Sequence, residues 1–261
     1  MVNNLILNKS QKVNNLILNK SQKVNNLVSN KSQKLNKSVS NKHHNTINTY
    51  IYTDSLILLK MNSIYFTKKY LIEECKCNEK HFELLSNFFY NYDYKMSNIR
   101  GGEKFNPPLG WTAIALNVKD KFYDHPYEDN DWLASDGRDG EWAIAYHGFG
   151  RGFEKEEMKT ILRSIIHNKL KIGVNQVFEN SIDKRHPGRL VGKGVYVTPS
   201  IQIAEAYSGK IKFGNRFFHI VIMLRVKPNF IREPIDKEDY WVLDSKVNNI
   251  RLYKLLFKET D

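Results

Sequence analysis

Cysteine is scarce in this chain, and its scarcity excludes a disulfide-stapled fold. The two cysteines, Cys75 and Cys77, are separated by one residue. This spacing is too short for an ordinary disulfide framework, and two thiols are too few for a structural zinc site. We therefore expect reduced thiols, no bound metal and an intracellular protein of the cytoplasm or the nucleus.

Long apolar runs are also lacking, which argues against a membrane protein. The apolar stretch at residues 50–66 is interrupted by Asp54 and Lys60, so it is a poor candidate for a membrane span. Lysines interrupt the apolar runs nearer the start, and the sequence therefore predicts no signal peptide. We expect no membrane partner.

Acidic residues and arginine are nearly missing from the first 60 residues, which hold nine lysines, no arginine and one acid, Asp54. The rest of the chain carries 31 basic and 27 acidic groups, so most of the formal charge of +12 belongs to this tail. A nucleic-acid-binding domain concentrates positive charge in its folded part. Binding of nucleic acid through the basic tail is therefore an alternative that we do not favour.

An eleven-residue repeat occupies the start of the tail. VNNLILNKSQK occurs at residues 2–12 and 13–23, and VNNLVSNKSQK follows at residues 24–34. This period is compatible with a right-handed helical supercoil, but each copy is rich in asparagine and has few good helix formers. We prefer disorder or weak self-association for residues 1–49.

Apolar spacing divides the remainder into a helical region, residues 50–97, and a main domain, residues 98–261. Hydrophobic residues make up 41% of the chain, enough for a core in which we place the four tryptophans. The pattern predicts a helix within residues 154–170 and a short one after Ser200, a candidate N-cap. Strand-like segments outnumber these helices and do not alternate with them, which predicts an α+β domain with mixed or antiparallel strands. These segments are 111–118, 141–148, 194–198, 217–226, 240–244 and 250–257.

Three separated segments carry residues suited to a binding site. One strand-like segment ends at His147-Gly148, where a planar amide could lie against a backbone that has no Cβ. Gly192-Lys193-Gly194-Val195-Tyr196 begins a second, and Tyr207 follows Tyr196 by eleven residues. Glu238-Asp239 begins a third. Taken singly, each has an ordinary structural explanation, such as a turn glycine, a core tyrosine or a solvated acid.

The order and spacing of these segments resemble the catalytic domain of ADP-ribosyltransferases of the poly(ADP-ribose) polymerase type. That family builds its site from His, Tyr and Glu on three strands. This chain has His147-Gly148, the Gly-Lys-Gly-Val-Tyr block with Tyr207 at the matching interval, and Asp239-Tyr240-Trp241-Val242 in place of the glutamate-led strand. The resemblance covers residues 143–257. It implies split mixed or antiparallel sheets with flanking helices.

The resemblance also implies NAD+ as co-substrate. Gly148 would present its backbone N–H and C=O to the nicotinamide carboxamide, while Tyr196 and Tyr207 would hold the pyridinium ring between them. His147 would hydrogen-bond a ribose hydroxyl of the adenosine half.

The charged residues would complete the site. Arg189, or alternatively Arg185, would meet the pyrophosphate from the loop at residues 183–191. The expected catalytic residues are His147, Tyr196 and Asp239, the aspartate stabilising the positive charge that develops on the ribose. Glu238 is the alternative carboxylate, because adjacent strand residues face opposite sides and a bulge would exchange them.

Two departures from the family pattern bear on the product. Phe149 and Ala204 stand where family members often carry a serine. We therefore expect transfer of a single ADP-ribose unit, most simply to a protein side chain, and no polymer synthesis.

Two rival interpretations remain. Aspartate in place of glutamate is compatible with a catalytically inactive domain that serves as a binding module or scaffold. An RNA 2′-phosphotransferase would need arginines on the equivalent strands, for which Arg225 and Arg251 are the candidates.

Overall fold

The computed structural model of the chain describes residues 64, 67–82, 88–89, 99–118, 130–168, 170–174, 176–244 and 248–260. The chain divides into two units, Met1–Leu58 and Leu59–Asp261, and the described residues all belong to the second. The repeats and the whole basic tail therefore lie outside the described residues, and so do residues 50–63 of the expected helical region. In the described part, no helix combines the length and the apolar character that crossing a membrane requires.

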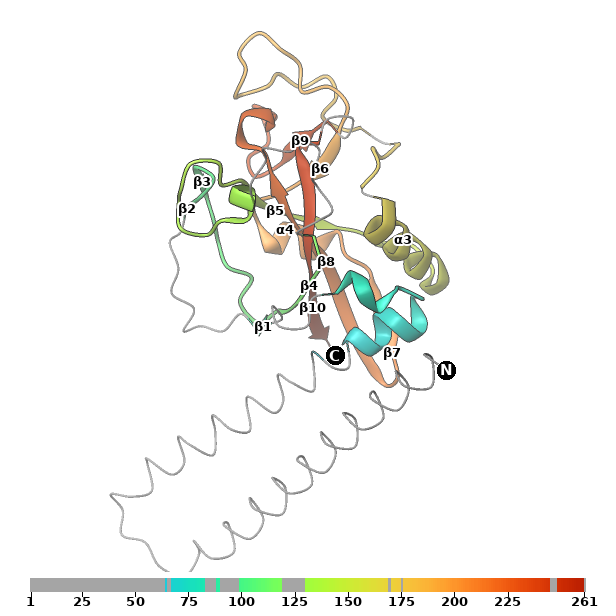
Figure 1. Cartoon of the computed structure of the whole chain (residues 1–261). Helices are drawn as coiled ribbons and strands as arrows, with labels where there is room; N and C mark the ends of the chain where they lie inside the picture. The colour runs from blue at the N-terminus through green and yellow to red at the C-terminus, as the bar shows by residue number, and fades with distance from the viewer. Residues whose placement is uncertain are drawn as a thin grey trace, which may run out of the picture. The chain divides into compact units, whose positions relative to one another are not determined.

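Antiparallel strands dominate the second unit (Figure 1). The strands are β1 Phe88–Phe89, β2 Ile99–Arg100, β3 Glu103–Lys104, β4 Thr112–Ala115, β5 Ala143–Gly148, β6 Val195–Val197, β7 Lys210–Phe213, β8 Arg216–Val226, β9 Trp241–Leu243 and β10 Ile250–Thr260. One sheet has the order β1-β4-β10-β8-β5, with β7 also paired to β8. The long strands β8 and β10 lie side by side at its centre, and most of the side chains of β8 and about half of those of β10 are buried. All the strand pairings described are antiparallel, so the α+β class is confirmed.

Among the described residues, helices α3 and α4 flank this sheet. Helix α3, Lys155–Asn168, buries Met158, Leu162 and Ile166, four residues apart on one face, as expected of an amphipathic helix. Helix α4, Ile201–Ala206, begins where the Ser200 hydroxyl accepts a hydrogen bond from the Ile203 N–H at 3.4 Å. It packs on β5 and β8. Short helical turns complete the described residues: η1 Tyr70–Glu74, η2 Glu79–His81, η3 Asn130–Leu133 and η4 Pro228–Phe230.

Strands β6 and β9 form a separate two-stranded ribbon that meets the large sheet at one place. Tyr146 of β5 exchanges both backbone hydrogen bonds with Thr198, at 2.7 and 2.9 Å. The next such pair in an antiparallel ladder would join Gly148 to Tyr196. The Tyr196 carbonyl instead accepts a hydrogen bond from His147 Nδ1 at 2.8 Å. The ladder therefore stops, and the two sheets separate beyond this point.

The core contains the four tryptophans, as expected, and both cysteines. Trp111, Trp132, Trp142 and Trp241 are buried. Cys75 and Cys77 are buried free thiols. Burial raises the pKa of Cys75 to about 12 and that of Cys77 to about 11, so both stay protonated at neutral pH.

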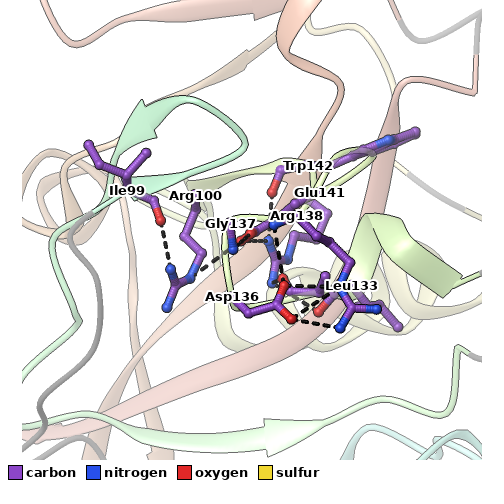
Figure 2. Close-up of polar contacts among 10 residues, drawn as sticks. Ile99, Arg100, Leu133, Asp136, Gly137, Arg138, Glu141 and Trp142 are labelled. Atoms are coloured by element: carbon purple, nitrogen blue, oxygen red, sulfur yellow. Dashed lines mark hydrogen bonds and ion pairs between the residues drawn. The ribbon is translucent and has the colours of Figure 1, made fainter.

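A buried ion-pair network ties the loop after η3 to the central strands (Figure 2). Glu141 Oε1 forms ion pairs with Arg100 Nε at 3.4 Å and with Arg225 Nη1 at 3.3 Å. Glu141 Oε2 accepts a hydrogen bond from the Gly137 N–H at 2.7 Å. Arg225 also donates to the carbonyls of Leu133, Ala134 and Trp142. These bonds attach the loop at residues 133–142 to Arg100 of β2 and Arg225 of β8.

Candidate functional site

The motif residues of β5, β6 and α4 come together around one cavity of about 360 Å³. His147 and Gly148 form one wall from the end of β5, Tyr196 another from β6, and Tyr207 a third from the C-terminal end of α4. The remaining lining residues are mainly apolar: Tyr146, Val177, Phe178, Val197, Thr198, Ile203, Ala204 and Tyr240. Segments far apart in sequence, from Tyr146 to Tyr240, thus share one site.

Gly148 contributes backbone atoms to this cavity and has no room for a side chain. Strand residues send their N–H and C=O to alternate edges, so Gly148 points its peptide groups to the same edge as Tyr146, where the ladder has stopped. A Cβ at Gly148 would lie 1.9 Å from the Ala204 carbonyl oxygen and 3.0 Å from the Tyr207 Cβ. The glycine therefore allows α4 to approach β5 and leaves a donor and an acceptor facing the cavity.

His147 is held in one orientation and one tautomer. A backbone carbonyl only accepts, so Nδ1 carries the proton that it donates to the Tyr196 oxygen, and Nε2 of the neutral ring is an acceptor. Burial lowers the pKa of His147, against the opposing effect of this hydrogen bond. The imidazole is therefore neutral at pH 7.

A second cavity, of about 410 Å³, lies on the other side of His147 and Tyr196, which line both cavities. Phe149 and the α3 residues Ile161 and Ser164 contribute to its walls. The imidazole and the Tyr196 phenol thus form a partition between two spaces of similar size.

The third motif lies differently from the other two. Tyr240 lines the 360 Å³ cavity, whereas Asp239 lines a neighbouring polar cavity of about 190 Å³, with Arg185 and Glu233 among its other residues. Asp239 has a left-handed backbone, with φ of 62°, which is uncommon for a residue other than glycine. Glu238 is 84% exposed and has Lys184 Nζ at 3.7 Å.

Neither arginine proposed for the pyrophosphate lines either large cavity. Arg185 donates to Glu103 at 2.5 and 3.1 Å and to Glu233 at 2.9 Å, and its guanidinium lies over the Trp241 ring. Arg189 is exposed. Arg185 therefore has a structural role in the described conformation.

Arg225 and Arg251, the arginines that a phosphotransferase would use, are buried outside both cavities. Arg225 belongs to the Glu141 network, and Arg251 lies over the rings of Trp132 and Trp142 at 4.8 and 4.3 Å. The geometry therefore does not favour that alternative.

The motifs did not indicate Phe178 or the α3 face as parts of the site. Phe178 lies in an irregular segment, and no strand or helix periodicity marks it. The α3 residues follow an ordinary amphipathic pattern, which by itself predicts only packing.

In sequence comparisons the chain matches no protein-family model and no curated protein. Among the described residues, no group of three or more His, Cys, Asp or Glu side chains is arranged to hold a metal ion.

The lowered pKa of His147 predicts a pH-dependent stability. The unfolded chain takes up a proton near pH 6.5, whereas folded His147 takes it up only at lower pH, so the free energy of unfolding falls as the pH drops below 6.5. The variant His147→Gln removes this contribution and should lose less stability than the wild type between pH 7.5 and 5.5. Urea unfolding at both pH values measures the difference.

His219, whose pKa burial also lowers, remains in both proteins and accounts for residual pH dependence. Equal losses of stability in the wild type and His147→Gln would contradict the assignment to His147.

Proposed function

We propose that this chain is an NAD+-dependent ADP-ribosyltransferase of the poly(ADP-ribose) polymerase type, which transfers one ADP-ribose unit to a protein side chain and releases nicotinamide. One observation carries the proposal: two cavities, of about 360 and 410 Å³, meet at His147 and Tyr196. A dinucleotide has two ring-bearing halves joined by a narrower linker, and paired cavities with a shared partition suit this shape.

The residues around the first cavity suit the nicotinamide half. The peptide groups of Gly148 on the open edge of β5 offer one donor and one acceptor, which is the complement of a carboxamide. The aromatic walls, Tyr196 and Tyr207 among them, suit a flat cationic ring.

The shared partition suits the sugar between the halves. Neutral His147 keeps Nε2 as an acceptor for a ribose hydroxyl, because its Nδ1–H is already engaged. Phe149 and Ala204, the two positions that lack a serine hydroxyl, line the second and first cavity respectively. This apolar lining supports transfer of a single unit.

In the proposed reaction the bond from ribose C1 to the nicotinamide nitrogen breaks, and the electron pair leaves with nicotinamide. The acceptor side chain forms the new bond to C1 and loses its proton to solvent or a base. Positive charge develops on the ribose ring, and a carboxylate beside it lowers the barrier. Asp239 is the candidate because it adjoins Tyr240, although it lines the neighbouring cavity.

The direct test uses NAD+ labelled in the adenosine half and in the nicotinamide ring. We expect release of labelled nicotinamide and addition of one ADP-ribose per modified acceptor site, measured by chromatography and intact mass. A ladder of polymer would contradict single-unit transfer. No release above the spontaneous rate would contradict the transferase assignment.

Replacement of the candidate carboxylate gives a sharper prediction. Asp239→Asn keeps the side-chain volume but removes the charge, so we expect nicotinamide release to fall on the order of 100-fold. Glu238→Gln is the matched control, because Glu238 is 84% exposed and lies outside the cavities. Its rate should equal that of the wild type. A larger loss in Glu238→Gln than in Asp239→Asn would assign the carboxylate to Glu238 instead.

A binding module without transferase activity is the second candidate function. The position of Asp239 favours it, since the 360 Å³ cavity has no carboxylate among its described lining residues. This candidate predicts saturable NAD+ binding by calorimetry with no nicotinamide released.

A further inference from the structure

Four aromatic rings form a continuous arc along the 360 Å³ cavity. Tyr196 stacks on Phe178, with the ring centroids 5.6 Å apart and the planes at 25°. Phe178 meets Tyr240 edge-on at 5.3 Å, and Tyr240 meets Tyr207 edge-on at 6.5 Å. All four side chains line the cavity. The two motif tyrosines are therefore connected through two further rings.

Hydrogen bonds fix both ends of this arc. The Tyr196 hydroxyl accepts from the Phe178 N–H at 2.8 Å, and the hydroxyls of Tyr207 and Tyr240 are 3.4 Å apart. The contact with Tyr207, together with burial, raises the pKa of Tyr240 to about 12. Tyr240 is therefore an uncharged phenol at neutral pH, and it offers its ring, not a phenolate, to the cavity.

No charged side chain competes with the rings for a ligand. The described lining residues include no aspartate, glutamate, lysine or arginine. His147 also lines the cavity, and burial, which lowers its pKa, keeps it neutral at pH 7. A cation in this cavity is therefore stabilised by aromatic faces, whereas a neutral ring of the same size gains only from contact and burial.

Asp239, which precedes Tyr240, has a left-handed backbone. Its φ of 62° turns the chain just before β9 begins at Trp241. Asp239 then lines the 190 Å³ cavity and Tyr240 the aromatic one.

We propose that Tyr240 and Phe178 complete a four-ring cage that selects a positively charged pyridinium over neutral nicotinamide. The proposal rests on the proposed function, in which the bound ring is cationic in NAD+ and neutral once the glycosidic bond has broken. The cage holds the donor and favours departure of the product, so nicotinamide is a weak inhibitor of this protein.

The test compares two probes that differ in charge, 1-methylnicotinamide and nicotinamide, by titration calorimetry on the full chain. The wild type should bind the cation tighter by about 2- to 30-fold, the range expected for a cation on aromatic faces. Tyr240→Leu keeps an apolar side chain without a π face and should lower the ratio, while the three remaining rings keep it above one. Tyr240→Phe keeps the ring without the hydroxyl and should retain the preference.

Phe230→Leu is the matched control, because Phe230 is an exposed ring that lies outside the cavity. Its ratio should equal that of the wild type. A ratio near one in the wild type, an unchanged ratio in Tyr240→Leu, or binding of neither probe would overturn the cage.

Nicotinamide release from NAD+, measured on the same samples, separates the two proposals. A cation preference that depends on Tyr240, without any release, supports the cage and contradicts the transferase. If nicotinamide is released and Tyr240→Leu leaves the ratio of the two affinities unchanged, the cage is contradicted and the transferase is not.

Discussion

Gly148→Ala should both destabilise the protein and abolish binding at the aromatic cavity. The new methyl group would lie 1.9 Å from the Ala204 carbonyl oxygen, which belongs to backbone and cannot rotate away. Helix α4 must then move from β5, at a cost of about 1–3 kcal/mol in the free energy of unfolding. Tyr207 moves with the helix, so affinity for NAD+ should be lost. Urea unfolding and titration calorimetry measure the two effects.

Gly173→Ala is the matched control for stability. A Cβ at Gly173 would lie 3.6 Å from Gln176 Nε2, an ordinary contact distance. This variant should unfold at a urea concentration equal to or above that of the wild type, because alanine restricts the unfolded chain. Wild-type stability and affinity in Gly148→Ala would contradict the close approach of α4 and β5.

Glu141→Ala should destabilise the protein strongly. The carboxylate forms ion pairs with two buried arginines, Arg100 and Arg225. Its removal leaves two buried guanidinium groups that have lost this counter-charge. Breaking a buried pair by removing one partner costs about 3–5 kcal/mol. Chemical denaturation monitored by fluorescence of the nearby Trp132 and Trp142 measures this loss.

Asp136→Ala provides the control in the same loop. Asp136 pairs with Arg138, but both side chains are more than half exposed, and exposed ion pairs contribute little. The variant should therefore unfold close to the wild-type midpoint. Similar midpoints for Glu141→Ala and Asp136→Ala would show that burial of the network does not matter to stability.

Most of the fold follows from periodicity. The strands β4, β5, β8 and β10 coincide with apolar segments predicted from the sequence, and α3 lies within its predicted range. Strand β7 was not predicted, because Lys210–Phe213 alternates charged and apolar residues over only four positions. Strand β7 forms because β8 is long enough to pair with two strands. Residues 216–219 of β8 pair with β7, and residues 221–226 pair with β5.

The site was predictable where a residue's role depends on its own segment. His147, Gly148, Tyr196 and Tyr207 share the cavity, in accordance with their spacing. Asp239 was assigned by its position before the Tyr240-Trp241-Val242 run, whereas the structure places Tyr240 at the aromatic cavity and Asp239 at the neighbouring one. Phe178 belongs to an irregular segment and reaches the cavity through tertiary packing. Sequence patterns within one segment carry no information about such packing.

The join between β5 and the β6–β9 ribbon has a mechanical consequence. His147 of β5 and Tyr196 of β6 belong to two hydrogen-bonded sheets that share one bridge among the described residues, between Tyr146 and Thr198. Moving the two sheets apart at the cavity therefore strains the two backbone hydrogen bonds between Tyr146 and Thr198 and the hydrogen bond between His147 and Tyr196. The backbone hydrogen bonds within each sheet stay intact. A ligand thicker than the present gap would therefore have to strain the hydrogen bonds between the sheets, which limits the thickness of the ring that the cavity can hold.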